Sequence, residues 1–277
     1  MLASSAAGVL ICIALLGWSI GGADPPVRQM LGMADGMVAP VPRTLSIVLA
    51  PGSPWPTPPL AVLVAGGRVT FRNDLAVPVT LRAAGPAPAA FAITVASHLS
   101  ATLTLARPGV YQYYDTRTAR VRHIVAGSAV LAPLTRPAAP RQGWIVVVDH
   151  TPGLQQNLVV PPRHDLFTPK ALAAVEGSTI LVSNHDEDAH NFAIDPASPV
   201  GAAFVVNGTK DEPPHGWQHV MVVQHPGLYH VYCTLHTRIV GRNSGWLVVV
   251  PQHQASGYAD GNPMEAWILV LPAGARV

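Results

Sequence analysis

The sequence predicts an all-β protein made of two consecutive β-sandwiches. Three observations carry this prediction: short Val-rich runs bounded by turn residues, 28 Pro and 24 Gly spread over 277 residues, and an internal repeat of domain size. Apolar residues make up 49% of the chain and charged residues 12%, which is ample for packed cores. No long segment has a helical period, so the strands are expected to form antiparallel or mixed sandwiches.

The internal repeat defines the two units. Pro108–Pro133 aligns without a gap onto Pro226–Pro251 at an offset of 118, and Pro58–Asn73 aligns onto Pro169–Asn184 at an offset of 111. The change of seven in the offset indicates an insertion in the second half, placed around 206–213. A repeat of this length has the size of a whole domain.

We therefore expect one domain at 44–133, a second at 141–251, and a C-terminal tail at 252–277. The tail holds one more apolar run, Ala266–Leu271, that the pattern does not place. The strands expected in the second unit are Trp144–Asp149, Ala171–Val175, Thr179–Asn184, His190–Ile194, His219–Val223, Gly227–Cys233 and Gly245–Val250.

Residues 1–23 carry no charged side chain, have an apolar core from Val9 to Ile20, and end in small residues before Asp24. This pattern predicts an export signal and a periplasmic or other extracytoplasmic location. The alternative is an uncleaved membrane anchor, because 23 uncharged residues can just span a bilayer. If the segment is removed, Cys233 is the only thiol that remains, so no disulfide can form within the chain.

Cys233 and His236, with two residues between them, come after an alternating strand that follows the Pro226-Gly227 turn. A second imidazole, His190, lies upstream on another expected strand. One soft thiolate and two borderline nitrogens suit both Cu(I) and Cu(II), so these three residues are the candidate ligands of one copper ion. Asn191 is placed to hydrogen-bond across to the Cys-bearing loop and orient the first His.

Two other interpretations of this residue set stay open. Cys233 can be an ordinary buried strand residue, and a Cys/His/His set is also compatible with zinc. His230, three residues before Cys233, is expected to face away from it on the strand and is interpreted as a surface or inter-domain residue.

The second unit resembles the cupredoxins, the blue copper proteins, and most closely the amicyanin and plastocyanin types. The residues that carry the resemblance are Asp188-Ala189-His190-Asn191-Phe192, Pro226-Gly227-Leu228-Tyr229-His230-Val231-Tyr232-Cys233-Thr234-Leu235-His236, and the strand from Phe167 to Thr179. The resemblance implies tandem Greek-key sandwiches, with His190, Cys233 and His236 as ligands of a type 1-like copper site. It also implies a protein redox partner, with electrons entering at an exposed edge of His236.

Two departures from the family pattern are expected to matter. The spacing of an axial Met falls on Ile239 or Gly241, so the site is predicted to lack a Met ligand. The first unit has Val79, Asp115 and Thr118 where the second has its candidate ligands, so it is predicted to be a metal-free copy.

The leading hypothesis is a copper-binding electron-transfer protein; the alternative is a non-redox copper storage or delivery protein, or a binding module with a decayed site. A multicopper oxidase or nitrite reductase is disfavoured, because Tyr232 and Thr234 flank Cys233 and no His-x-His pair occurs. Nucleic-acid binding has little support, since the net charge is only +2 and no basic cluster interleaves with aromatics. Membrane contact is expected only if residues 1–23 stay attached.

Overall fold

The computed structural model describes residues 41–53, 55–84, 90–125, 128–134, 140–150, 152, 155–198, 218–243, 246–252 and 263–275. The expected export segment 1–23 and the expected insertion at 206–213 lie outside the described residues. Within these ranges no helix is long and apolar enough to cross a membrane.

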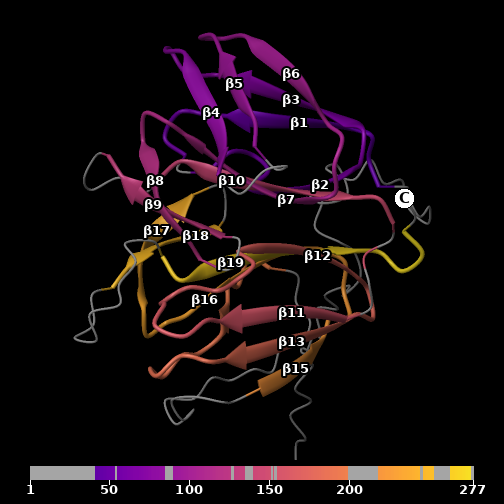
Figure 1. Cartoon of the computed structure of the whole chain (residues 1–277), viewed down its shortest axis with the longest axis vertical. Helices are drawn as coiled ribbons and strands as arrows, with labels where there is room; N and C mark the ends of the chain where they lie inside the picture. Colours follow the sequence, from indigo (N-terminus) through magenta and orange to yellow (C-terminus); the bar gives the residue numbers. More distant parts are fainter. Residues whose placement is uncertain are drawn as a thin grey trace, which may run out of the picture.

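The fold is all-β, as predicted, and each half of the chain contains two packed sheets (Figure 1). In the first half, one sheet is β1 (Thr44–Leu49), β3 (Gly67–Asn73) and β6 (Ser100–Leu105). The other has the order β2 (Leu60–Val64), β10 (Gln142–Val148), β7 (Gly109–Asp115), β4 (Val79–Ala84) and β5 (Ala92–Val95). Ile47 and Phe71 from the first sheet pack against Tyr113 and Ile145 from the second to form the core between them.

The second half repeats this arrangement. One sheet is β11 (Gln155–Val160), β13 (Thr179–Asn184) and β15 (Gln218–Val222), and the other is β12 (Ala171–Val175), β19 (Glu265–Leu271), β16 (Gly227–Tyr232) and β14 (Ala193–Ile194). Their core includes Ile180, Val182, Tyr229 and Val231. Each half also carries a two-stranded hairpin, β8 (Ala119–Val125) with β9 (Ser128–Pro133), and β17 (Thr237–Asn243) with β18 (Trp246–Pro251).

Local features recur at the two offsets found in the sequence. Thr57-Pro58 and Thr168-Pro169 both have cis peptide bonds, at the offset of 111. The hydroxyl of Tyr111 donates to the carbonyl of Arg107 at 2.7 Å, and that of Tyr229 to the carbonyl of His225 at 2.8 Å. The same hydrogen bonds therefore fix the turn before β7 and the turn before β16.

The expected boundary at residue 141 is wrong. Strand β10, which we expected to open the second domain, pairs in parallel with β2 and antiparallel with β7 of the first half. In the same way β19, which lies in the expected tail, pairs with β12 and β16 at the centre of the second half's sheet. The expected domain bounds at 133 and 251 make the hairpin strands β9 and β18 the last strands of the two domains, because a Val-rich run does not reveal which sheet it joins.

The two halves pack face to face through their larger sheets, as Figure 1 shows around β2, β10, β12 and β19. Apolar side chains fill this interface, among them Leu60, Val62, Trp144, Val146, Ala171, Leu228, Trp267 and Leu269. Strands such as β2 and β12 are consequently buried on both faces, which explains their continuous apolar sequences.

His230 lies in this interface and is fully buried, so of the two expected positions it occupies the inter-domain one. Its ring stacks on Trp267 with centroids 4.2 Å apart, and Trp55 of the first half approaches to 5.9 Å. Its Nδ1 lies 3.2 Å from Asp195 Oδ2 and its Nε2 lies 2.9 Å from Glu265 Oε2. Burial opposes charging the ring, but the hydrogen bonds with the two carboxylates outweigh it and raise the pKa of His230.

Candidate metal centre

Strand alternation and two turns position the three candidate ligands. On β16 the side chains of Tyr229 and Val231 face the core of the second sandwich, and Cys233 continues this face directly after the strand. His236 follows on the turn that leads into β17, and His190 precedes β14 on the neighbouring segment. The sequence therefore brings two separate loops to one end of the sandwich.

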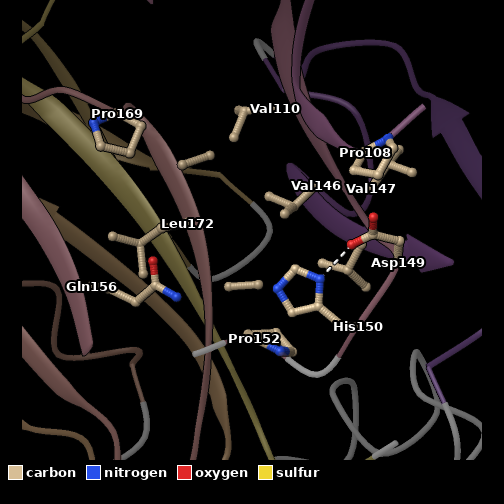
Figure 2. A pocket seen from close by; sticks show the side chains of 13 residues that line it. Pro108, Val110, Val146, Val147, Asp149, His150, Pro152, Gln156, Pro169 and Leu172 are labelled. Atoms are coloured by element: carbon tan, nitrogen blue, oxygen red, sulfur yellow. Dashed lines mark hydrogen bonds and ion pairs between the residues drawn. The ribbon is translucent and has the colours of Figure 1, made fainter. Parts of the chain in front are cut away.

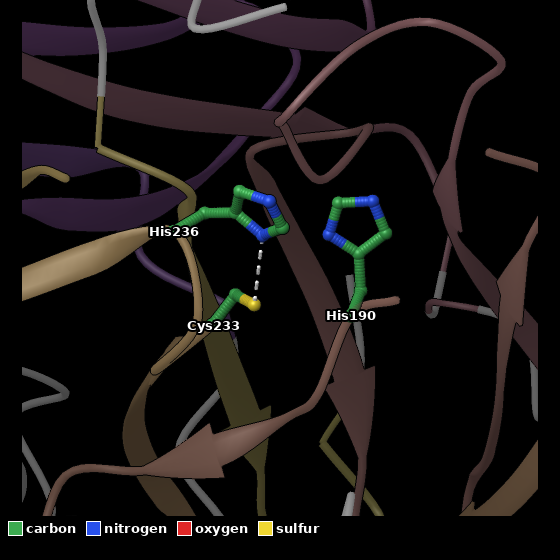
Figure 3. A group of neighbouring side chains, drawn as sticks. All are labelled: His190, Cys233 and His236. Carbon is green, nitrogen blue, oxygen red and sulfur yellow. Dashed lines mark hydrogen bonds between the residues drawn. The ribbon is translucent and has the colours of Figure 1, made fainter. Parts of the chain in front are cut away.

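The three side chains converge there, as Figure 3 shows. One potential ligand atom from each of His190, Cys233 and His236 lies within 4.8 Å of the others. The Sγ of Cys233 is 3.4 Å from Nδ1 of His236, and the two imidazole centroids are 4.4 Å apart. His190 and Cys233 are 0% exposed and His236 is 3% exposed.

Burial controls the protonation of this group. It lowers the pKa of His190 and lowers the pKa of His236 to about 4, so both imidazoles are neutral at neutral pH. Burial also raises the pKa of the Cys233 thiol, although backbone N–H groups near the sulfur act in the opposite direction. A neutral imidazole offers one nitrogen lone pair to a metal, and metal binding would have to displace the thiol proton.

Asn191 holds the two loops together, as the sequence indicated. Its side-chain amide donates to the hydroxyl of Thr234 at 2.6 Å, and its carbonyl oxygen accepts the Thr234 N–H at 2.7 Å. The backbone N–H of Asn191 points to Sγ of Cys233 at 3.4 Å. These bonds fix the separation between the His190 loop and the Cys233 loop.

No family model and no curated protein matches this chain. Among solved structures, the chain is similar to cupredoxins. A mutant of amicyanin in its Cu(I) form matches 38% of this chain and 82% of its own, at 18% identity and a TM-score of 0.27. A purple cupredoxin from Nitrosopumilus maritimus matches 37% of this chain and 98% of its own, at 18% identity and a TM-score of 0.26.

Three aspartates beside the imidazoles were not anticipated from the sequence. Asp186 Oδ2 lies 2.9 Å from Nε2 of His190, and Asp165 Oδ1 lies 3.4 Å from Nε2 of His236. Potential ligand atoms of Asp165, Asp188 and His236 also lie within 4.8 Å of one another. The acidic run Asp186-Glu187-Asp188, just before His190, was a usable signal for two of them. Asp165 had no such signal, because it comes from a distant loop.

The expected exposed edge of His236 is wrong. Asp165 lies against its outer nitrogen, and the adjacent Leu166 packs on Val125 and Val130 of the first half's hairpin. Ser128 of that hairpin also lies 3.3 Å from Thr168, oxygen to oxygen. The first half thus packs against the loop that covers His236. No feature of the sequence near the Cys-x-x-His motif predicts this contact.

The positions considered for an axial Met do not lie in the core. Ile239 is 48% exposed on β17, and Gly241 on the same strand is exposed as well. The residue that meets Cys233 is Met264, whose carbonyl accepts the Cys233 N–H at 3.0 Å. Met264 is fully buried in the same apolar cluster as Cys233. The prediction of a site without a Met ligand depends on the spacing after His236, and hairpin β17–β18 comes between His236 and Met264, so it stays a prediction.

The first half has an ion cluster at the corresponding place. Asp115 stands where the second half has Cys233, and its carboxylate pairs with Arg117 at 2.8 Å and with Arg141 at 3.7 Å. The N–H of Asp115 donates to the Arg141 carbonyl at 3.0 Å, as that of Cys233 does to Met264. A charge network therefore fills the position that the thiol and the thioether residue occupy in the second half.

A separate cleft of about 220 Å³ lies between the halves, at β7, β10 and β12. Figure 2 shows His150 within it, hydrogen-bonded to Asp149, with Val146 and Leu172 on opposite walls. Gln156 lies apart from that pair. The polar groups among the described lining residues do not converge, so we assign no ligand to this cleft.

Proposed function

We propose that this chain binds one copper ion through Nδ1 of His190, Sγ of Cys233 and Nδ1 of His236, and that it works as an electron-transfer protein. The observation that carries the proposal is the convergence of these three donors in a buried space. Nδ1 of His190 is buried and has no hydrogen-bond partner among the described residues, so a metal would satisfy an otherwise costly polar atom.

The donor set favours copper because a thiolate with two imidazoles suits both of its oxidation states. The bound ion would supply reversible one-electron chemistry, and the chain's own residues would hold the donors in place and exclude water. Met264 is buried in the same cluster as Cys233 and its carbonyl accepts the Cys233 N–H, so it would be a fourth residue able to hold the ion through its thioether. No substrate-binding site is needed for this function, so the chain is proposed to be a carrier that exchanges electrons with a protein partner.

We further propose that the protein acts in the periplasm or another extracytoplasmic compartment, with residues 1–23 as its export signal or anchor. The first half is proposed to be a metal-free cupredoxin-like unit that supports the second. Its ion cluster of Asp115, Arg117 and Arg141 replaces the donors and gives copper nothing soft to bind.

The experiment is a Cu(II) titration followed by visible spectroscopy and reduction with a small electron donor. A carrier gives an intense thiolate-to-copper band that bleaches and returns over repeated cycles. Cys233→Ser abolishes the band, while His185→Gln, an exposed His five residues from His190, leaves it unchanged. Absence of the band in the wild-type protein would overturn the copper assignment, and copper that is lost to a chelator without cycling would favour storage or delivery.

A further inference from the structure

The imidazoles of the candidate metal centre have carboxylates on the side away from the cysteine. Nε2 of His190 lies 2.9 Å from Asp186, and both side chains are 0% exposed. Nε2 of His236 lies 3.4 Å from Asp165, and these side chains are 2% and 7% exposed. Each His thus lies between a carboxylate and the space next to Cys233.

Asp186 is held in this position independently of any metal. Its Oδ1 accepts the backbone N–H groups of Arg163 at 2.7 Å and Glu187 at 2.8 Å. Its own N–H donates to the side-chain oxygen of Asn184 at 2.9 Å. Oδ1 is therefore occupied by the turn, and Oδ2 is the oxygen left for His190.

This geometry selects one tautomer of His190, whose Nε2 is hydrogen-bonded to Asp186. At His236 the charge of Asp165 favours the same tautomer, although Nε2 of His236 makes no hydrogen bond among the described residues. A neutral imidazole carries a single N–H, and a carboxylate is an acceptor only. The proton is therefore favoured on Nε2, facing the aspartate, and Nδ1 keeps its lone pair. In the opposite tautomer, the Nε2 lone pair would face a buried carboxylate and Nδ1–H would occupy the proposed metal position.

The first half shows that the turn itself does not require these acids. Asn73 stands where the second half has Asn184, and it makes the equivalent bonds to Leu75 N–H at 3.0 Å and to the Val77 carbonyl at 2.9 Å. Leu75 and Val77 stand in place of Asp186 and Asp188. The half that lacks the candidate ligands therefore also lacks the acids, although it keeps the same turn.

We propose that Asp186 is a positioning residue that holds His190 in the Nε2–H tautomer through a hydrogen bond, with Nδ1 directed at the metal position, and that the charge of Asp165 favours the same tautomer of His236. The tautomer part concerns the metal-free protein, and the effect on copper rests on the proposed function. Carboxylates that accept the outer N–H of metal-bound His make the ligands more basic, and their removal typically costs 10- to 100-fold in metal affinity. Their negative charge also favours Cu(II) over Cu(I), so the reduction potential is lowered by them.

Asp186→Asn is the decisive variant, because it keeps the shape of the side chain. The Asn oxygen stays with the N–H groups of Arg163 and Glu187, so its NH₂ group faces His190 and donates to Nε2. That reversal forces the proton onto Nδ1. Asp165→Asn is the second variant and acts on His236. The matched control is Asp149→Asn, which alters an exposed Asp–His pair far from the site.

The first measurement is ¹⁵N NMR of the ring nitrogens in the metal-free full chain. We expect protonated Nε2 in His190 and His236 of the wild type, and protonated Nδ1 in His190 of Asp186→Asn. The second measurement is copper affinity and reduction potential: we expect a 10- to 100-fold loss of affinity for Cu(II) and a higher potential in Asp186→Asn, with no change in the control.

A wild-type protein with Nδ1–H on His190, or an Asp186→Asn variant that keeps the wild-type tautomer and potential, would overturn the positioning role. Failure of the wild type to bind copper, with the expected tautomers present, would instead refute the proposed function and leave the positioning of the rings established. If Asp186→Asn does not fold, the same two outcomes are read for His236 in Asp165→Asn.

Discussion

The carbonyl of Met264 accepts the backbone N–H of Cys233 at 3.0 Å, although 30 residues separate them in the chain. The hairpin β17–β18 accounts for half of that separation, and the closing strand β19 then runs antiparallel to β16. The segment between Cys233 and Met264 thus returns the chain to the end of the sandwich where the thiol and the two imidazoles lie. This return is the basis for proposing Met264 as a fourth residue that would hold the ion.

Met264→Leu is expected to remove the thioether beside Cys233 while keeping the volume of the side chain. Hydrophobic swaps of this kind usually cost less than about 1.5 kcal/mol of stability. With copper bound, we expect the reduction potential to rise, by about 59 mV for each tenfold gain in preference for Cu(I). Protein-film voltammetry measures the shift.

Met221→Leu is the control for this substitution, because Met221 is equally buried in the same core cluster. It should change stability by a similar amount and leave the potential unaltered. Equal potentials in Met264→Leu and the wild type would show that Met264 only fills space.

The sequence predicted the local elements well and their partners less well. The strands at Ala171–Val175 and Thr179–Asn184 begin and end where we expected. Strand β10 was expected in the wrong domain and the pattern did not place β19, because the apolar runs of β9 and β18 have a similar composition and come earlier in the chain. The hydrophobic period and the composition of a segment indicate how buried it is. The sheet that the segment joins depends on contacts with segments that are distant in the sequence.

The residues of the site were likewise predicted in part. The Cys-x-x-His spacing and the upstream His-Asn pair identified three residues that the structure brings together. Met264 and Asp165 reach the site from a returning strand and a separate loop, so no local spacing could reveal them. The cover over His236 was missed for the same reason, because it depends on how the first half packs against the loop at Asp165.

Acidification is expected to destabilise the metal-free protein between about pH 6.5 and pH 4. Burial lowers the pKa of His236 to about 4, so within this window the unfolded chain binds a proton at His236 that the folded protein does not. Each unit of difference in pKa corresponds to about 1.4 kcal/mol. Urea unfolding at several pH values measures the slope.

His236→Gln should flatten that acid slope, because the variant has no imidazole to protonate at this position. His185→Gln removes an exposed His and should keep the wild-type slope. An unchanged slope in His236→Gln would mean that this ring is protonated as readily in the folded protein as in the unfolded chain.

Above pH 6.5 the buried His230 is expected to make the metal-free protein less stable as the pH rises, whereas His236 makes it less stable as the pH falls. Two carboxylates raise the pKa of His230, so the stability that it contributes is complete below its unfolded value of about 6.5. That contribution is lost as the pH rises through the higher pKa that His230 has in the folded protein. Together with His236, this predicts maximal stability of the metal-free protein near pH 6.5.

His230→Phe separates the charge from the packing, because the aromatic ring can still stack on Trp267. It leaves Asp195 and Glu265 buried without their shared partner, and breaking a buried pair in this way typically costs about 3–5 kcal/mol. We expect a large loss of stability at pH 6 that shrinks at higher pH. A loss that does not depend on pH would contradict a charged His230.

Trp55 is expected to be a main contributor to the contact between the halves. Its ring meets Trp267 edge-on at 5.6 Å and lies 5.9 Å from His230, and only 6% of its surface is exposed. Truncating a buried Trp to Ala usually costs about 3–5 kcal/mol. Because the removed contacts cross the interface, Trp55→Ala should also make the two halves unfold in separate steps.

Scanning calorimetry would resolve two transitions, while Leu99→Ala, at a 60% exposed position of the first half, should keep the wild-type profile. A single transition shifted to lower temperature would show that the remaining apolar interface couples the halves without Trp55.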